Sequence, residues 1–170
     1  MRAKGVSREM TNEGYIQIDG WKANIRFSAA HIIPEYEKCG RLHGHSYAIH
    51  ARFYGKKDEK GIIVDFSIVK NILKQIADCL DHFILIPGKN SSIDLKQDED
   101  RISITFHQKT YVLPNQDCII LPIQSTSAEN LAEFVLESLL EQLENIDQLV
   151  RIEIGVDEGY GQGAYVSKDL

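Results

Sequence analysis

The sequence predicts an α+β fold, in which strands and helices follow one another in blocks along the chain. Strand-like and helix-like stretches occur in the order strand, strand, helix, helix, strand, strand, with a hairpin between the helices. The expected strands are 15–28, 45–54, 150–156 and 164–166, and the expected helices are 67–80 and about 127–144.

The strands are predicted from alternation of apolar and polar residues. In 45–54, Tyr47, Ile49, Ala51 and Phe53 share one face, and polar residues fill most of the other. The stretch 15–28 is expected to kink near the Gly20-Trp21 pair. In 150–156 the apolar residues again fall on alternate positions.

The helices are predicted from apolar residues at helical spacing. In 67–80 they recur at 68, 69, 72, 73, 76 and 80, which gives one apolar stripe. Thr126-Ser127-Ala128-Glu129 matches a capping box, in which Thr126 caps the amide of Glu129 at the start of the second helix. Asp65 is expected to cap the first helix, followed by Phe66 as a core aromatic.

The segment between the helices is predicted to be an insertion at about 89–124. Residues 87–100 are rich in Pro, Gly, Asn, Ser and acidic residues and are expected to form a loop, while 102–106 and 110–113 form a small hairpin. The insertion is too short for a core of its own. We therefore expect a flexible N-terminal extension over 1–14 and a single domain over 15–170.

Composition excludes several classes of function. The chain has 170 residues, of which 43% are hydrophobic and 26% charged, as is usual for a soluble globular protein. A net charge of −6 argues against nucleic acid or an anionic membrane as the partner. Since no apolar run approaches the length of a membrane span, a cytoplasmic location is expected. Three cysteines make no disulfide framework, and Cys79 and Cys118, in apolar stretches, are expected to be buried, inert thiols.

Three histidines have the spacing of a metal site. His43 and His45 flank Gly44, so in a strand both imidazoles point to one face, and His31 lies where a neighbouring strand can supply it. Three imidazoles without a fourth protein ligand are typical of a catalytic zinc site, although iron, nickel and copper also accept imidazole. His50 and His107 lack such partners and are expected to be structural or solvated.

Further candidates are one thiol and two acidic residues. Cys39 precedes His43 by four positions, where a dication and Arg41 would favour the thiolate and make it a usable base. Asp81-His82 follows the first helix, and its sequence fits equally a histidine oriented by a carboxylate to shuttle a proton or a helix end decorated by histidine. Glu158 has the parity of the apolar face of its strand, so it is either a buried carboxylate that needs a partner or a solvated residue after the strand.

These motifs together resemble the 6-pyruvoyltetrahydropterin synthase family. The matching stretches, in the family's order, are 27–31 (FSAAH), 39–46 (CGRLHGHS), 64–66 (VDF), 80–82 (LDH), 127–130 (SAEN) and Glu158. The resemblance implies the tunnelling fold, or T-fold: a four-stranded antiparallel sheet with two helices on one face. It also implies a homohexamer, a dimer of trimers, with active sites at the subunit interfaces. The three-residue gap between Cys39 and His43 resembles the carboxy-forming branch, the 6-carboxytetrahydropterin synthases.

The resemblance also implies a role for each candidate. His31, His43 and His45 would bind Zn²⁺, Cys39 would be the base, and Asp81 with His82 would return protons. Glu158, helped by Ser127, would hold the pterin of 7,8-dihydroneopterin triphosphate.

The carboxy-forming branch converts that substrate to 6-carboxytetrahydropterin, acetaldehyde and triphosphate, on the route to queuosine-type 7-deazaguanine nucleosides. Alternatives are a pyruvoyl-forming synthase or a dihydroneopterin-cleaving relative. From another class of function, a non-catalytic, metal-stabilised pterin-binding module is the remaining alternative.

Overall fold

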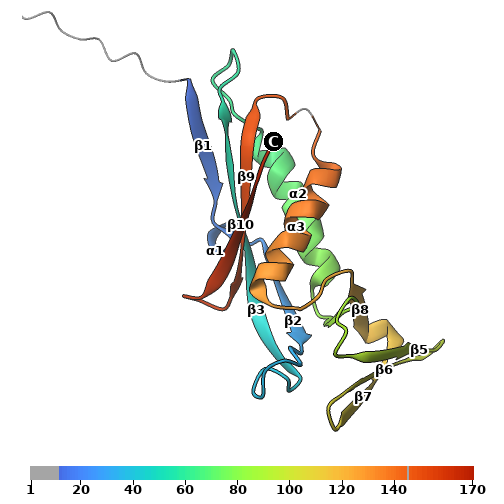
Figure 1. The fold of residues 1–170 in the computed structure, drawn as a ribbon. Helices are drawn as coiled ribbons and strands as arrows, with labels where there is room; N and C mark the ends of the chain where they lie inside the picture. The colour runs from blue at the N-terminus through green and yellow to red at the C-terminus, as the bar shows by residue number, and fades with distance from the viewer. Residues whose placement is uncertain (1–11, 145) are drawn as a thin grey trace, which may run out of the picture.

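The fold is organised by one long strand, β3 (His43–Lys56), in a computed structural model that describes residues 12–144 and 146–170 (Figure 1). Strand β2 (Arg26–His31) pairs antiparallel with the first half of β3, and β1 (Glu13–Ile18) pairs with the second half. Helix α1 (Gly20–Ala23) is a single turn between β1 and β2. The predicted kink near Gly20 is therefore a helical turn that separates two strands.

The opposite edge of β3 carries the C-terminal hairpin. Strand β9 (Leu149–Glu158) pairs antiparallel with β3, and β10 (Gly163–Asp169) pairs with β9. Counting β1 and β2 as one interrupted strand, this part of the molecule is the expected four-stranded antiparallel sheet. The strand order in this part of the sheet is β10-β9-β3-β2, with β1 paired to the second half of β3.

The prediction of a purely antiparallel sheet is wrong at the β2 edge. Strand β4 (Ile84–Pro87) pairs parallel with β2, and β8 (Cys118–Leu121) pairs parallel with β4, which gives a mixed sheet of seven strands over the described residues. Both added strands are only four residues long. Their pairing is made between residues far apart in sequence, so alternation within each run could not reveal it.

The predicted insertion forms a second, small sheet. Strands β5 (Asp94–Gln97), β6 (Arg101–Phe106) and β7 (Lys109–Pro114) pair antiparallel, and the turn Asn115–Asp117 leads into β8. The hairpin is confirmed, but the loop expected over 87–100 contains β5. The apolar residues of β6 do not form a core by themselves but cluster with Ile86 of β4 and with Ile32, the residue after β2.

Helices α2 (Phe66–Leu80) and α3 (Ala128–Gln142) lie on one face of the main sheet (Figure 1). Their apolar stripes pack with the inward rows of β3 and β9 in the larger hydrophobic cluster. Asp65 caps α2 as predicted, accepting a hydrogen bond from the Ser67 amide at 2.7 Å. Phe66, however, is 48% exposed rather than buried. No helix in the described ranges is long and apolar enough to cross a membrane.

The cap of α3 is one residue later than predicted. Ser127 is the N-cap, and its hydroxyl accepts from the Asn130 amide. The Thr126 hydroxyl instead donates to the Ile32 carbonyl at 2.9 Å, and Thr126 is completely buried. This long-range bond connects the residue before the N-cap of α3 to the residue after β2.

Two further expectations need correction. Cys79 is exposed on α2 and Cys118 is half-buried, so neither is the buried thiol that its apolar surroundings predicted. The predicted N-terminal extension, 1–14, lies mostly outside the described residues, and its last two residues belong to β1.

Candidate metal centre and substrate pocket

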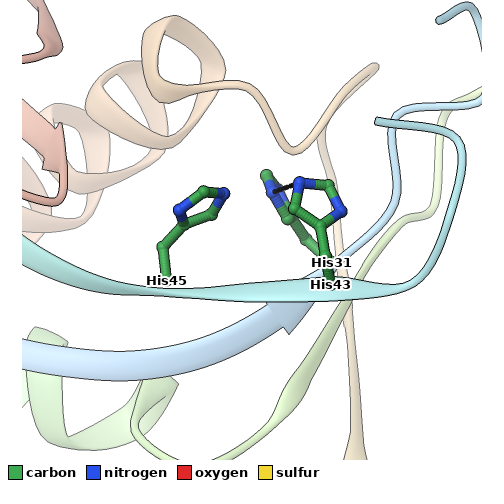
Figure 2. Close-up of side chains that lie close together, drawn as sticks. All are labelled: His31, His43 and His45. Atoms are coloured by element: carbon green, nitrogen blue, oxygen red, sulfur yellow. Dashed lines mark hydrogen bonds between the residues drawn. The ribbon is translucent and has the colours of Figure 1, made fainter. Parts of the chain in front are cut away.

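The three predicted metal ligands meet on the helix-covered face of the sheet. His31 at the end of β2 lies directly opposite His43 at the start of β3, and His45 is two residues further along β3. Figure 2 shows all three rings on the same side of β3. One ligand atom from each side chain lies within 4.8 Å of the others. The strand alternation that predicted convergence of His43 and His45 is thus present in the structure.

Backbone carbonyls orient two of the rings. His31 Nδ1 donates to the Thr126 carbonyl at 2.9 Å, and His43 Nδ1 donates to the Arg41 carbonyl at 2.7 Å. A carbonyl can only accept, so Nδ1 of each ring carries a proton, and in the neutral ring this leaves the lone pair on Nε2, which is turned inward. Metal-binding histidines in proteins commonly donate their other ring N–H to a backbone carbonyl or a carboxylate in this way.

Burial keeps the first of these imidazoles neutral. His31 is completely buried, and the loss of hydration lowers its pKa to about 4, against a smaller opposing effect of its hydrogen bond to Thr126. Burial, followed by the charge of His43, also lowers the pKa of His45. Neutral imidazole is the form that binds a metal.

The spacing of the rings fits a tetrahedral cation. His31 Nε2 and His43 Nε2 are 3.2 Å apart (Figure 2). Two nitrogens bound to one zinc ion at 2.0–2.1 Å and at a tetrahedral angle lie about 3.3 Å from each other. Because both rings donate through Nδ1, two inward lone pairs would face each other across this gap, and a cation between them would remove the repulsion. The residues present therefore fit a metal ion.

Cys39 lies in the loop that joins two of these histidines. The loop, 32–42, leaves β2 directly after His31 and enters β3 at His43, which are paired in register. Cys39 is half-buried, and its carbonyl accepts a hydrogen bond from the Ile33 amide at 2.8 Å. The structure thus attaches the predicted base to the same strand pair that carries the metal ligands.

Asp81 and His82 form a hydrogen-bonded pair at the end of α2. Asp81 Oδ2 lies 2.8 Å from His82 Nδ1, and Asp81 Oδ1 accepts from the Ser28 amide at 2.7 Å. The bond from Ser28, ahead of the interaction with His82, holds the pKa of Asp81 below its ordinary value. His82 has a φ of 65°, and its side chain is 81% exposed. The carboxylate therefore orients the ring, as one of the two alternatives predicted.

The exposed His82 lies on the other face of the sheet from the histidine cluster. It borders a hollow of about 460 Å³ whose lining includes Ser28, Gly44 and Ser46 and also Ala29 and His45. Along the two strands Ser28, Gly44 and Ser46 alternate with Ala29, His45 and Tyr47, whose side chains point to the helix-covered side. One chain therefore presents its metal-ligand candidates and its Asp81–His82 pair on opposite faces.

Glu158 is the last residue of β9 and continues its buried row. The strand does not end before it, so the solvated alternative is wrong. Its Oε1 is buried without a hydrogen-bond partner among residues 12–144 and 146–170. Burial, ahead of the charge of Glu129, raises the pKa of Glu158, against an opposing effect of His43. With Ser127 and Glu129 it lines a cavity of about 270 Å³.

Sequence reasoning missed Tyr47, which faces Glu158 across the β3–β9 pairing. Its hydroxyl is buried and, within the described part of the chain, has no partner. Burial, and then the charge of Glu158, raises its pKa. The alternation of β3 could have identified Tyr47 as the next residue on the face of His43 and His45. Its position beside a carboxylate depends on the register with β9, which one strand alone does not reveal.

Comparison with known proteins places this geometry in a family. A family model described as 6-pyruvoyl tetrahydropterin synthase matches residues 21–167. A Methanocaldococcus jannaschii protein provisionally named 6-carboxy-5,6,7,8-tetrahydropterin synthase is 35% identical over 91% of this chain and 97% of its own length. A Rickettsia bellii protein named 6-carboxy-5,6,7,8-tetrahydropterin synthase is 31% identical over 70% of this chain and 78% of its own length.

Solved structures of the same family are similar to this one in fold. The 6-pyruvoyl tetrahydropterin synthase of Plasmodium falciparum superposes with a TM-score of 0.86 at 27% identity, and the match covers 94% of this chain and all of that one. The corresponding enzyme of Plasmodium vivax gives a TM-score of 0.85 at 26% identity over the same shares. The predicted T-fold is thereby confirmed.

Proposed function

Since the chain belongs to the 6-pyruvoyl tetrahydropterin synthase family, we propose that it is a zinc-dependent 6-carboxy-5,6,7,8-tetrahydropterin synthase. It would convert 7,8-dihydroneopterin triphosphate to 6-carboxytetrahydropterin, acetaldehyde and triphosphate, in 7-deazaguanine nucleoside synthesis of the queuosine type. The observation that carries this proposal is the convergence of three imidazole nitrogens at the ends of the Cys39 loop. The names of the two relatives favour the carboxy product.

The metal would be held by Nε2 of His31 and His43 and by a ring nitrogen of His45. Zinc suits an imidazole-only set best among common ions, and with three protein ligands it leaves a coordination position open. Zinc bound there would supply Lewis acidity toward the side-chain hydroxyls of the substrate. The chain's part is to keep His31 neutral, which its burial achieves, and to turn Nε2 of His31 and His43 toward the cluster, which the Thr126 and Arg41 carbonyls achieve by accepting from Nδ1.

The acid–base work would be shared by the remaining candidates. Cys39, as thiolate, would accept a carbon-bound proton of the substrate side chain, and His82, oriented by Asp81, would deliver protons. Glu158 would accept hydrogen bonds from pterin N–H groups through its otherwise unpartnered Oε1, at the cavity that Ser127 also lines.

Product analysis tests this function. The metal-loaded protein is incubated with 7,8-dihydroneopterin triphosphate, and the products are identified by mass. Acetaldehyde together with 6-carboxytetrahydropterin is expected. A pyruvoyl product without acetaldehyde would show the sibling activity, which the names of the Plasmodium neighbours favour. Tight binding of metal and pterin without turnover would instead support the non-catalytic module.

The two-faced arrangement supports a shared active site in a homohexamer. Because His82 and the histidine cluster lie on opposite faces, the His82 of one subunit would serve the metal centre of another. Cys39→Ala and His82→Ala proteins are each expected to be inactive. Co-assembled in equal amounts they should regain about a quarter of wild-type activity, since half of the subunits supply each group. Mixtures that stay inactive while assembling normally would contradict a shared site.

A further inference from the structure

The loop that carries Cys39 is shaped by backbone hydrogen bonds between its own residues. Within 32–42 the described chain forms turns but no helix or strand. Its internal backbone bonds include Ile33 amide to Cys39 carbonyl at 2.8 Å and Gly40 amide to Tyr36 carbonyl at 2.7 Å. Both bonds join parts of the same loop, so they shape it without attaching it to the sheet. The position of Cys39 therefore depends on what the loop contacts.

The inserted hairpin supplies those contacts. At the turn between β6 and β7, His107 Nε2 donates to the Pro34 carbonyl at 3.1 Å. At the start of β7, Lys109 Nζ donates to the Gly40 carbonyl at 3.0 Å. Gly40 directly follows Cys39, so one bond holds the entering arm of the loop and the other holds the residue beside the thiol. The Lys109 bond is charge-assisted and is the stronger kind.

A small core fixes the hairpin and the start of the loop together. Five buried residues form this core. One follows β2, one is in β4 and three are in β6: Ile32, Ile86, Ile102, Ile104 and Phe106. Ile32 is the first residue of the loop, and it is 1% exposed. The ammonium of Lys109 lies 5.7 Å from the centre of the Phe106 ring, within the range of a cation–π contact. The buried Phe106 thus helps to orient the Lys109 ammonium toward the Gly40 carbonyl.

A second polar contact holds the loop from the other side of the insertion. Asn90 Nδ2 donates to the Glu35 carboxylate and to the Gln124 carbonyl, both at 2.8 Å. Asn90 is 8% exposed. Residues before β5 and after β8 are thereby joined to the same loop. The insertion therefore contacts the Cys39 loop at Ile32, Pro34, Glu35 and Gly40.

We propose that Lys109 and His107 are positioning residues that hold the Cys39 loop in the geometry for proton abstraction. The inference rests on the proposed function, in which Cys39 is the base. A misplacement of about 1 Å at a reacting group costs about 100-fold in rate, so a loop whose own bonds do not attach it to the sheet needs such external bonds. The inserted sheet is then part of the catalytic apparatus, because it acts through the position of Cys39.

Hydrogen exchange tests the hold on the loop directly. In full-length, metal-loaded protein, Lys109→Met keeps the apolar stem but loses the donor, and His107→Asn tolerates the left-handed φ of 49° but is too short to reach Pro34. Backbone exchange of 33–42 is expected to rise about tenfold in each variant, while 43–56 stays unchanged. Lys96→Met is the matched control, because Lys96 pairs with Asp94 inside the insertion and leaves exchange of the loop as in wild type.

Turnover of 7,8-dihydroneopterin triphosphate tests the consequence. We expect kcat of Lys109→Met to fall about tenfold or more, with KM and zinc content unchanged, and Lys109→Arg to recover most of it. Unchanged exchange in both variants, or faster exchange with unaltered kcat, would overturn the positioning role. A wild-type protein without turnover would refute the proposed function instead, and the exchange result would still decide whether the insertion holds the loop.

Discussion

Acidification of the metal-free protein gives a sharp test of the buried imidazole. His31 is completely buried, and its pKa is lowered from 6.5 to about 4, mainly by loss of hydration. Above pH 6.5 the ring is neutral in both the folded and the unfolded chain, and the protein keeps its full stability. Between about pH 6.5 and 4 the unfolded chain binds a proton that the folded chain excludes, so the free energy of unfolding falls as the pH falls.

The size of the effect follows from the shift. One pKa unit corresponds to 1.36 kcal/mol, so His31 removes about 3 kcal/mol between neutral pH and pH 4. That is a large part of the stability of an ordinary domain, about 5–15 kcal/mol. Carboxylates lose stability over an overlapping range, so a comparison with a chain lacking this one ring is needed.

His31→Gln provides that comparison, because glutamine does not titrate and keeps a donor for the Thr126 carbonyl. Urea unfolding of both metal-free proteins is measured at pH 7 and pH 4, at one protein concentration because subunit association also contributes. Wild type should lose about 3 kcal/mol more than the variant between the two pH values. An equal loss in the two proteins would refute the burial argument, and with it the claim that the ring is held neutral for a metal.

Three further predictions concern single side chains. Cys39→Ala should lower turnover by about 100-fold to 10,000-fold in a steady-state assay, with metal content by elemental analysis unchanged; normal turnover would exclude it as the base. Glu158→Gln should raise KM for the pterin substrate by about tenfold or more, and an unchanged KM would place the pterin elsewhere. Thr126→Val should lower the free energy of unfolding by about 1–3 kcal/mol in urea titrations, because the buried Ile32 carbonyl loses its donor, whereas Thr126→Ser should not.

Local periodicity was enough to predict the elements that depend on their own sequence. The helix expected over 67–80 is α2, 66–80, because a broad apolar stripe decides which face packs on the sheet. The strand expected over 45–54 is the centre of β3. The convergence of His43 and His45 follows from strand alternation alone.

The features that could not be predicted from the sequence depend on contacts with residues far away along the chain. Strands β4 and β8 are four-residue apolar runs, whose parallel pairing joins residues 84–87 to 118–121. Thr126 looked like a cap because it precedes a glutamate by three positions, but its hydroxyl is taken by the Ile32 carbonyl. Neither partner is visible in the local pattern, because each lies more than thirty residues away.

The candidate site is also where the fold leaves its buried polar groups without partners. Glu158 Oε1 and the Tyr47 hydroxyl are the two such side-chain atoms found in the described residues, and they face each other across one strand pair. Most proteins satisfy such groups, so an unsatisfied pair costs stability unless a ligand supplies the hydrogen bonds.

His31 adds a third desolvated group on the same face of the sheet. Each of these costs is of the kind that a bound ligand removes: a cation for the inward nitrogens, and N–H donors for the carboxylate. A bound ligand would therefore gain most from the buried polar groups that have no hydrogen-bond partner in the folded chain. Strand alternation places His43, His45 and Tyr47 in one row of β3, and the pairing with β2 and β9 brings His31 and Glu158 beside that row, so the candidate metal ligands and the unpartnered carboxylate belong to one site.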